Sequence, residues 1–238
     1  MKQFPWIFSV LWLVILIVMI SAGFWQLSRA EEKQQIKERM DAVQINKPET
    51  WTDWQQLKAF DPVEINGQYS HTHFLLDNQI SEGQVGYFVF TAFQTTDGIW
   101  LLINRGWTDN SEQNFAVKQS QQNIQGLLAD WPRPGVQLGE QTLSNQVIQH
   151  VTYLEQQPII DLLKQRHCQQ NADENCIILP QVLKLDAMMD DGYQRQWQLP
   201  RMTVEKHQAY AIQWFTMSLV LCFIYVLFVY KNYYASKN

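Results

Sequence analysis

The architecture follows first from the stretch between Phe4 and Leu27, which reads FPWIFSVLWLVILIVMISAGFWQL. Residues 3 to 28 carry no charged side chain, and neither do residues 208 to 230. A helix rises about 1.5 Å per residue, so each run is long enough to cross a hydrocarbon core of roughly 30 Å. The sequence therefore predicts transmembrane helices at residues 4–28 and 209–230, and it excludes an ordinary soluble enzyme.

Charge is distributed unevenly along the 238 residues. All 23 acidic residues fall between Glu31 and Glu205, whereas the tails outside the two runs carry only cations, Lys2, Lys231 and Lys237. Cations beside a span favour the cytoplasmic side. We therefore expect both termini in the cytoplasm and residues 29–208 in the periplasm, anchored in a bacterial inner membrane. The formal net charge of -5 argues against a nucleic-acid partner.

The first span has an alternative interpretation as a cleavable signal peptide. Its apolar run is longer than the roughly 7 to 15 residues typical of such peptides. It also ends in Phe24 and Trp25, where a signal peptidase requires small residues. An uncleaved anchor is therefore the favoured interpretation.

Between the spans, the hydrophobic pattern changes to the period of two that is typical of β-strands. Strand-like runs lie at residues 63–69, 73–77, 85–93, 99–104, 124–130, 147–153 and 177–186. Asp97-Gly98 predicts a hairpin turn, residues 158–166 predict a helix, and residues 188–202 have no clear period. Because most strands follow one another directly, we predict an α+β domain: an antiparallel β-sheet or partly closed barrel with a few helices, inserted between two transmembrane helices.

Motifs for catalysis are absent from the sequence, which contains no P-loop, no G-x-S-x-G and no H-E-x-x-H. His71 and His73 are spaced to share one face of a strand, as two metal ligands would. No third ligand stands nearby in the sequence, so exposed histidines at a strand edge are the favoured interpretation. We expect neither a metal site nor an enzyme.

The three cysteines are Cys168, Cys176 and Cys222. Cys222 lies within the second span, where a thiol behaves as a small hydrophobic group. The spacing of the other two fits neither a redox C-x-x-C nor a zinc knuckle. A local disulfide is favoured in an oxidising compartment, with free thiols and metal ligands as alternatives.

Polar and aromatic residues gather where the two spans begin and end. Trp25, Gln26 and Arg29 lie where the first span ends. His207, Tyr210 and Trp214 lie where the second begins, at a helical spacing that predicts one shared face. An aromatic belt with a snorkelling arginine explains most of them. It explains His207 less well. An imidazole at this position could instead ligate haem iron, and Arg29 could pair with a haem propionate.

Five pieces of sequence, in order, resemble the Surfeit locus protein 1 family, the assembly factors of haem-copper cytochrome c oxidase. They are residues 23–33, 67–69, 104–107, 124–126 and 207–215. The resemblance implies a non-enzymatic role: helping haem a reach oxidase subunit I, or stabilising that subunit alongside other oxidase assembly factors. Residues 168–176 depart from the family pattern.

The resemblance also implies that haem a is bound transiently, with His207 as its ligand. It marks nine further positions: Trp25, Gln26, Arg29, Asn104, Arg105, Gly106, Trp107, Tyr210 and Trp214. From the residues themselves, we expect Gly106 to permit a tight turn after a strand and Trp107 to lie in the core. We expect Arg105 to pair with a carboxylate inside the domain, with an anionic ligand as the alternative.

Two other functions are compatible with the sequence. Two spans around an extracytoplasmic domain are the layout of a periplasmic sensor, although only eight residues follow Tyr230. A membrane-tethered thiol protein would use Cys168 and Cys176, but their spacing disfavours a reactive thiol beside a resolving partner.

Overall fold

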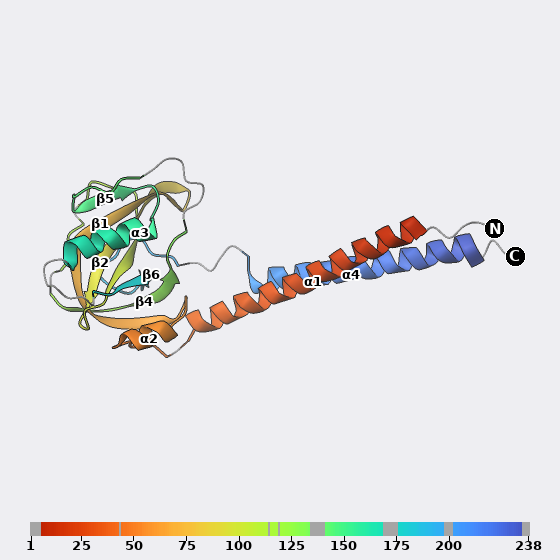
Figure 1. The fold of residues 1–238 in the computed structure, drawn as a ribbon, viewed down its shortest axis with the longest axis horizontal. Helices are drawn as coiled ribbons and strands as arrows, with labels where there is room; N and C mark the ends of the chain where they lie inside the picture. The colour runs from red at the N-terminus through yellow and green to blue at the C-terminus, as the bar shows by residue number, and fades with distance from the viewer. Residues whose placement is uncertain are drawn as a thin grey trace. The chain divides into compact units, whose positions relative to one another are not determined.

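The computed structural model describes residues 6–42, 44–113, 115–118, 120–133, 141–168, 176–197 and 202–234. The chain divides into two compact units, Met1–Glu38 with Gln198–Asn238, and Arg39–Trp197 (Figure 1). Several predicted features lie outside the described residues: the cations Lys2 and Lys237, the first residues of the first span, and the segment between Cys168 and Cys176.

The first unit contains two long helices, α1 (Trp6–Met40) and α4 (Val204–Val229), and α4 continues into a short π-helix, η1 (Tyr230–Tyr234). Both helices are long and apolar enough to cross a membrane, and only 6% of the most apolar window of each is buried. Helix α1 continues past the predicted span and ends at Met40. The positions at which the helices would leave a membrane stay predictions.

Helices α1 and α4 run side by side in opposite directions (Figure 1). Their partly or fully buried residues include two series in alternating steps of three and four, which is the pattern of a coiled-coil seam. On α1 the series is Ser9, Trp12, Leu16, Met19, Gly23, Gln26 and Ala30. On α4 it is Val204, His207, Ala211, Trp214, Ser218, Leu221 and Tyr225.

Direct contacts hold this seam along its length. Trp12 Nε1 donates a hydrogen bond to the Leu221 carbonyl oxygen at 3.2 Å, and the Tyr225 hydroxyl donates to Ser9 Oγ at 2.8 Å. Further along, a Cβ added to Gly23 would stand 2.6 Å from the Phe215 ring. Small residues and interhelical hydrogen bonds are the usual means by which helices associate in lipid.

The second unit is built on a six-stranded sheet: β1 (Pro62–Ser81), β2 (Gln84–Thr95), β3 (Trp100–Thr108), β4 (Gln122–Asp130), β5 (Ile148–Val151) and β6 (Ile178–Leu185). The strand order is β2-β3-β6-β4-β1-β5, and β2 also pairs with β1. Strand β1 uses residues 62–67 against β4 and residues 67–81 against β2. Five strands therefore close into a ring, which confirms the predicted α+β class and barrel.

The sheet is mixed, and this corrects the antiparallel alternative. Four pairings are antiparallel, but β1 pairs with β5 and β3 pairs with β6 in parallel. A long connection that contains α3 (Gln156–His167) precedes β6. Parallel strands need such a connection, so β6 can run in the same direction as β3. Local strand patterns carry no information about such a return.

The inside of the ring is a continuous apolar core with side chains from all five ring strands. Examples, one from each strand, are Ile65, Phe93, Leu101, Leu128 and Leu183. Nearly all of this cluster comes from the strands themselves, with a buried contribution from Trp54 of α2 (Trp51–Gln56). A sheet can bury one face largely against itself only by curling around it, so this cluster marks the barrel interior.

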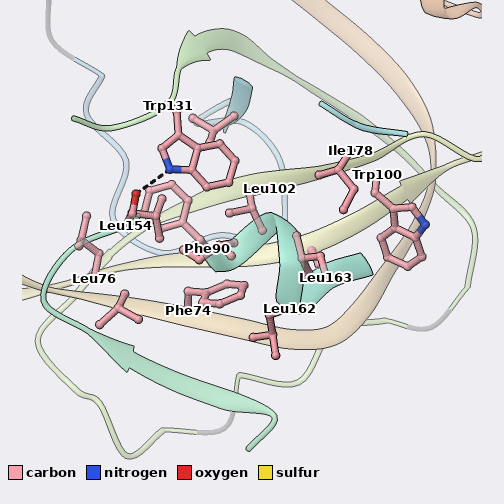
Figure 2. Packing of buried hydrophobic residues seen from close by; sticks show 14 of the residues in the cluster. Phe74, Leu76, Phe90, Trp100, Leu102, Trp131, Leu154, Leu162, Leu163 and Ile178 are labelled. Carbon is pink, nitrogen blue, oxygen red and sulfur yellow. Dashed lines mark hydrogen bonds between the residues drawn. The ribbon is translucent and has the colours of Figure 1, made fainter. Parts of the chain in front are cut away.

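Helix α3 covers the opposite, outer face of the sheet. Ile159, Leu162 and Leu163 pack against strand residues such as Phe74 and Leu102 (Figure 2). In the same cluster Trp131 Nε1 donates a hydrogen bond to the Leu154 carbonyl oxygen at 2.7 Å. The two strands predicted at residues 63–69 and 73–77 prove to be one long strand, β1.

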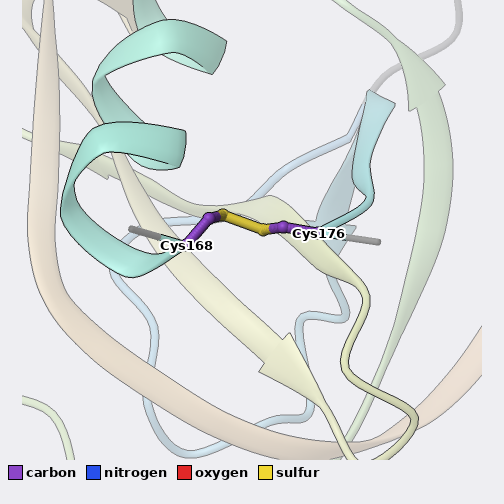
Figure 3. Close-up of a disulfide and its surroundings, with 2 residues drawn as sticks. All are labelled: Cys168 and Cys176. Atoms are coloured by element: carbon purple, nitrogen blue, oxygen red, sulfur yellow. A yellow bond between two sulfur atoms is a disulfide. The ribbon is translucent and has the colours of Figure 1, made fainter. Parts of the chain in front are cut away.

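Two local predictions are confirmed. The turn at Asp97-Gly98 joins β2 and β3, and Gly98 adopts a φ of 83°, which favours glycine. Cys168 and Cys176 form a disulfide that links the end of α3 to the start of the β6 region (Figure 3).

Candidate functional site

The histidine that opens α4 contacts the predicted glutamine of α1. His207 Nδ1 lies 2.7 Å from Gln26 Oε1, and the His207 side chain is only 6% exposed. An amide oxygen can only accept, so Nδ1 carries the proton and donates it to Gln26. Both residues belong to the helical seam, so the packing of α1 on α4 brings together two positions 181 residues apart in the chain.

The aromatic residues near this pair face outward. Trp25 is 55% and Tyr210 is 46% exposed, whereas Trp214 is half-buried on the seam. The expectation that His207, Tyr210 and Trp214 share one face is therefore only partly met, because Tyr210 lies beside the seam. The exposed rings of Trp25 and Tyr210 offer flat apolar surfaces near the His207–Gln26 pair.

Arg29 is positioned by two neighbours on its own helix. Its guanidinium lies 5.7 Å from the centre of the Trp25 ring and forms an ion pair with Glu32. The Arg29 side chain remains 47% exposed, so the ion pair is weak and the guanidinium can exchange Glu32 for another anion.

A groove lies on the same helix pair, on the side away from the apolar spans. Its volume is about 440 Å³, and its lining includes Leu27, Ala30, Gln34 and Glu38 from α1 with Val204 and Gln208 from α4. Gln34 Nε2 donates to Glu38 Oε1 at 2.8 Å, so two of the polar side chains in this lining pair with each other. The groove lies between the two helices, next to His207.

The donor set around His207 fits a haem ligand. Metal-bound histidines usually donate their second ring N–H to an oxygen, which fixes the tautomer and orients the ring. The hydrogen bond from Nδ1 to Gln26 does this and leaves Nε2 as the nitrogen that would bind iron. Among the described residues, no group of three or more His, Cys, Asp or Glu side chains could hold a metal ion by itself.

The motif of residues 104–107 lies in the other unit, within strand β3. The strand continues to Thr108, so the predicted turn at Gly106 is wrong. Gly106 has a φ of 111°, and an added Cβ would stand 2.7 Å from the Gln194 carbonyl oxygen. Glycine is thus required here by a bend inside the strand and by the close approach of a second segment.

The remaining motif residues hold that second segment. Trp107 and Gln194 exchange two backbone hydrogen bonds, and the Tyr193 N–H donates to the Arg105 carbonyl oxygen at 2.7 Å. Asn104 Oδ1 accepts from the Gly106 N–H at 3.1 Å. Trp107 is 6% exposed, as expected for a core residue. The motif therefore attaches the chain after β6 to β3.

Arg105 is buried, but its partners are not the ones expected. Its Nε donates to the Asp191 backbone oxygen at 2.8 Å, and Nη1 donates to the Phe115 carbonyl oxygen at 3.2 Å and Thr91 Oγ1 at 3.4 Å. The guanidinium also lies over the Tyr69 and Tyr193 rings. Among the described ion pairs none involves Arg105, so the expected carboxylate partner is wrong. Backbone dipoles and ring faces stabilise the charge instead.

His73 belongs to the same buried network, which corrects its expected place at an exposed strand edge. It is 3% exposed, and its Nδ1 lies 3.0 Å from Thr91 Oγ1. Burial and the nearby Arg105 charge lower the pKa of His73 to about 4. His71 is exposed, because the pairing of β1 with β2 is irregular between Tyr69 and His73. The two histidines therefore do not form a metal site together.

Sequence reasoning missed this network. Tyr69 and His73 lie on β1, Thr91 lies on β2 and Arg105 lies on β3, so only the pairing of these strands brings the four side chains together. The alternation of apolar residues in β1 indicated burial of one face, which was the one available signal.

Comparison with known proteins gives a consistent result. Residues 13–219 match the SURF1 family. The chain is 25% identical to a SURF1-like protein of Rickettsia conorii, over 89% of this chain and 86% of that protein. It is 26% identical to a SURF1-like protein of Rickettsia felis, over 91% and 95%. It is also 29% identical to Surfeit locus protein 1 of Xenopus tropicalis, over 43% and 41%.

Proposed function

Because the chain belongs to the SURF1 family, we propose that it is a membrane-anchored, non-enzymatic assembly factor for haem-copper cytochrome c oxidase. In this proposal it helps haem a reach oxidase subunit I, or stabilises that subunit while its cofactors are inserted. The hydrogen bond between His207 and Gln26 is the observation that carries the haem part, since it prepares one imidazole nitrogen for iron.

The residues around His207 have distinct roles in this proposal. His207 Nε2 is the iron ligand, and Gln26 holds the imidazole in the required tautomer. The exposed rings of Trp25 and Tyr210 supply apolar surface for a porphyrin, and Arg29 exchanges Glu32 for a propionate. When bound, haem a supplies the iron and porphyrin that the oxidase requires, and the protein only holds and releases it.

Location and partners belong to the same proposal. The predicted charge asymmetry supports cytoplasmic termini and a periplasmic domain in the inner membrane of a bacterium. The partners are oxidase subunit I, other oxidase assembly factors and the lipid bilayer. The negative formal charge gives no reason to add nucleic acid.

The test uses the full-length protein purified from cells that make haem a. We expect the wild type to retain haem a in its visible spectrum, and we expect His207→Ala to lose it. Gln26→Leu should retain less, because the imidazole loses the acceptor that orients it. Gln208→Ala is the matched control, since this exposed residue follows His207 on the same turn.

A deletion strain separates the two parts of the proposal. If the wild type is colourless but the deletion lowers oxidase levels, the haem role is rejected and the stabilising role is supported. If the wild type is colourless and oxidase levels are normal without it, the whole proposal is rejected.

A further inference from the structure

A cavity of about 320 Å³ lies at one end of the barrel and has no part in the proposal above. Its apolar wall includes Ile124 near the start of β4, Leu185 at the end of β6, and Met189 in the connection after β6. Tyr69 of β1 also lines it, and polar residues such as Lys118 complete the lining. The mouths of β-barrels are recurrent places for small-molecule sites.

The Tyr69 hydroxyl is the feature that requires explanation. Tyr69 is 2% exposed, and its hydroxyl is one of two buried side-chain polar atoms without a hydrogen-bond partner among the described residues. The other is Trp54 Nε1, which does not line this cavity. Buried hydroxyls are normally paired, because leaving one unpaired destabilises the fold. A phenylalanine would fill the same space without this penalty.

Two guanidinium groups lie behind the cavity wall. Arg105 stands over the Tyr69 ring and donates to the Asp191 backbone oxygen. Arg195 donates to the backbone oxygens of Asp186 at 2.6 Å and Tyr193 at 3.1 Å, and to that of Met189. Both side chains therefore hold the loop that forms the wall, and they bring positive charge close to the hydroxyl.

Two carboxylates, Asp190 and Asp191, also line the cavity. Asp191 faces Lys118, with 4.0 Å between the carboxylate oxygen and Nζ, and Asp190 is exposed to solvent. Solvent screens exposed charges much more than buried ones. Burial raises the pKa of Tyr69 well above its usual range and the Asp191 charge adds to this, against smaller opposite effects of Arg105 and Arg195. The hydroxyl therefore keeps its proton and can donate it.

We propose that this cavity binds a small amphipathic anion, a carboxylate or phosphate group on a short apolar body. An anionic oxygen accepts the hydrogen bond of the Tyr69 hydroxyl in the field of Arg105 and Arg195, and Lys118 contributes at the rim. The apolar part packs on Ile124, Leu185 and Met189. Through Arg105, the family motif then holds the wall of a ligand site.

The test uses the full-length chain in nanodiscs of neutral lipid, with hexanoate and hexyl phosphate as probes and calorimetric titration as the readout. Inorganic phosphate tests the need for the apolar body, hexanol tests the need for the charge, and empty nanodiscs correct for partitioning. We expect at least one amphipathic anion to bind, and to bind at least about ten-fold more tightly than hexanol. Comparing the two anions distinguishes a carboxylate source from a phosphate source such as a lipid headgroup.

Two variants locate the binding. Tyr69→Phe removes only the hydroxyl and should weaken binding about ten-fold or more, while its Tm stays equal to that of the wild type or rises. Tyr87→Phe is the matched control, because Tyr87 is a half-buried tyrosine of the same barrel that does not line the cavity. Met189→Trp should block the cavity without changing Tyr69.

The proposal is overturned if neither anion binds the wild type, or if Tyr69→Phe and Tyr87→Phe bind equally well. A lower Tm for Tyr69→Phe without ligand would also overturn it, because the hydroxyl would then be paired inside the fold. None of these results depends on haem retention by His207, so the two proposals fail separately.

Discussion

Replacing Gly67 by alanine tests the closure of the barrel. Gly67 is the residue of β1 that pairs with both β2, at Thr95, and β4, at Gln122. An added Cβ would stand 2.0 Å from the Gln94 carbonyl oxygen, 2.5 Å from the Phe93 ring and 2.8 Å from the Thr95 Cα. Two of these three atoms belong to the backbone, so no side-chain rotation relieves the contact.

The size of the effect follows from these distances. An ordinary contact begins near 3.4 Å, so β1 and β2 would have to separate by about 1.4 Å, the difference between 3.4 and 2.0 Å. This separation breaks at least one ladder hydrogen bond, at about 1 kcal/mol each. Overpacking adds about 1–3 kcal/mol. We therefore expect Gly67→Ala to lower the free energy of unfolding by roughly 2–4 kcal/mol.

The measurement is urea unfolding of the full-length protein in detergent, followed by tryptophan fluorescence and near-UV circular dichroism. Gly98→Ala is the control: its Cβ would meet nothing within 4 Å, and its φ of 83° alone should cost about 1 kcal/mol. If Gly67→Ala is as stable as wild type, or no less stable than Gly98→Ala, the close approach of β1 and β2 at this point is refuted.

Three further changes test other parts of the structure. As the pH falls from 6.5 to about 4, His73 binds a proton in the unfolded chain but not yet in the folded one. The free energy of unfolding should therefore fall by up to about 3 kcal/mol over this range. If urea titrations gave His73→Gln the same pH profile as the wild type, this prediction would be contradicted. Replacing Cys168 and Cys176 by serine removes a disulfide between residues with a sequence separation of 8, and should lower the free energy of unfolding by about 2–3 kcal/mol. The measurement is thermal unfolding, and a change in Tm no larger than that of Cys222→Ser would contradict the prediction. Leu183→Ala leaves a cavity in the barrel interior and should lower the free energy of unfolding, measured in urea, by about 2–5 kcal/mol. Met188 is 87% exposed, so Met188→Ala should be nearly neutral.

Much of the candidate site around His207 could be predicted from the sequence. His207, Gln26 and Arg29 were identified because they stand where the apolar runs begin and end, and because the family resemblance marks the same positions. Their partners could not be predicted: only the pairing of α1 with α4 places Nδ1 of His207 against Gln26 and leaves Tyr210 outside the seam.

In the barrel, the strand segments were predictable and their assembly was not. The prediction of a carboxylate partner for Arg105 was wrong, because its partners depend on which loops cross the end of the barrel. The burial of His73 likewise depends on the pairing of β1 with β2, which brings its side chain to Thr91.

Hydrophobic runs, alternation and the Asp97-Gly98 turn act over a few neighbouring residues, so the sequence alone determined two long apolar helices and most of the strands between them. The tertiary structure decided the ring closure, the parallel return of β6 and the residues that meet at the barrel end. Those features depend on the packing of segments far apart in the chain, and no local pattern of side chains specifies it.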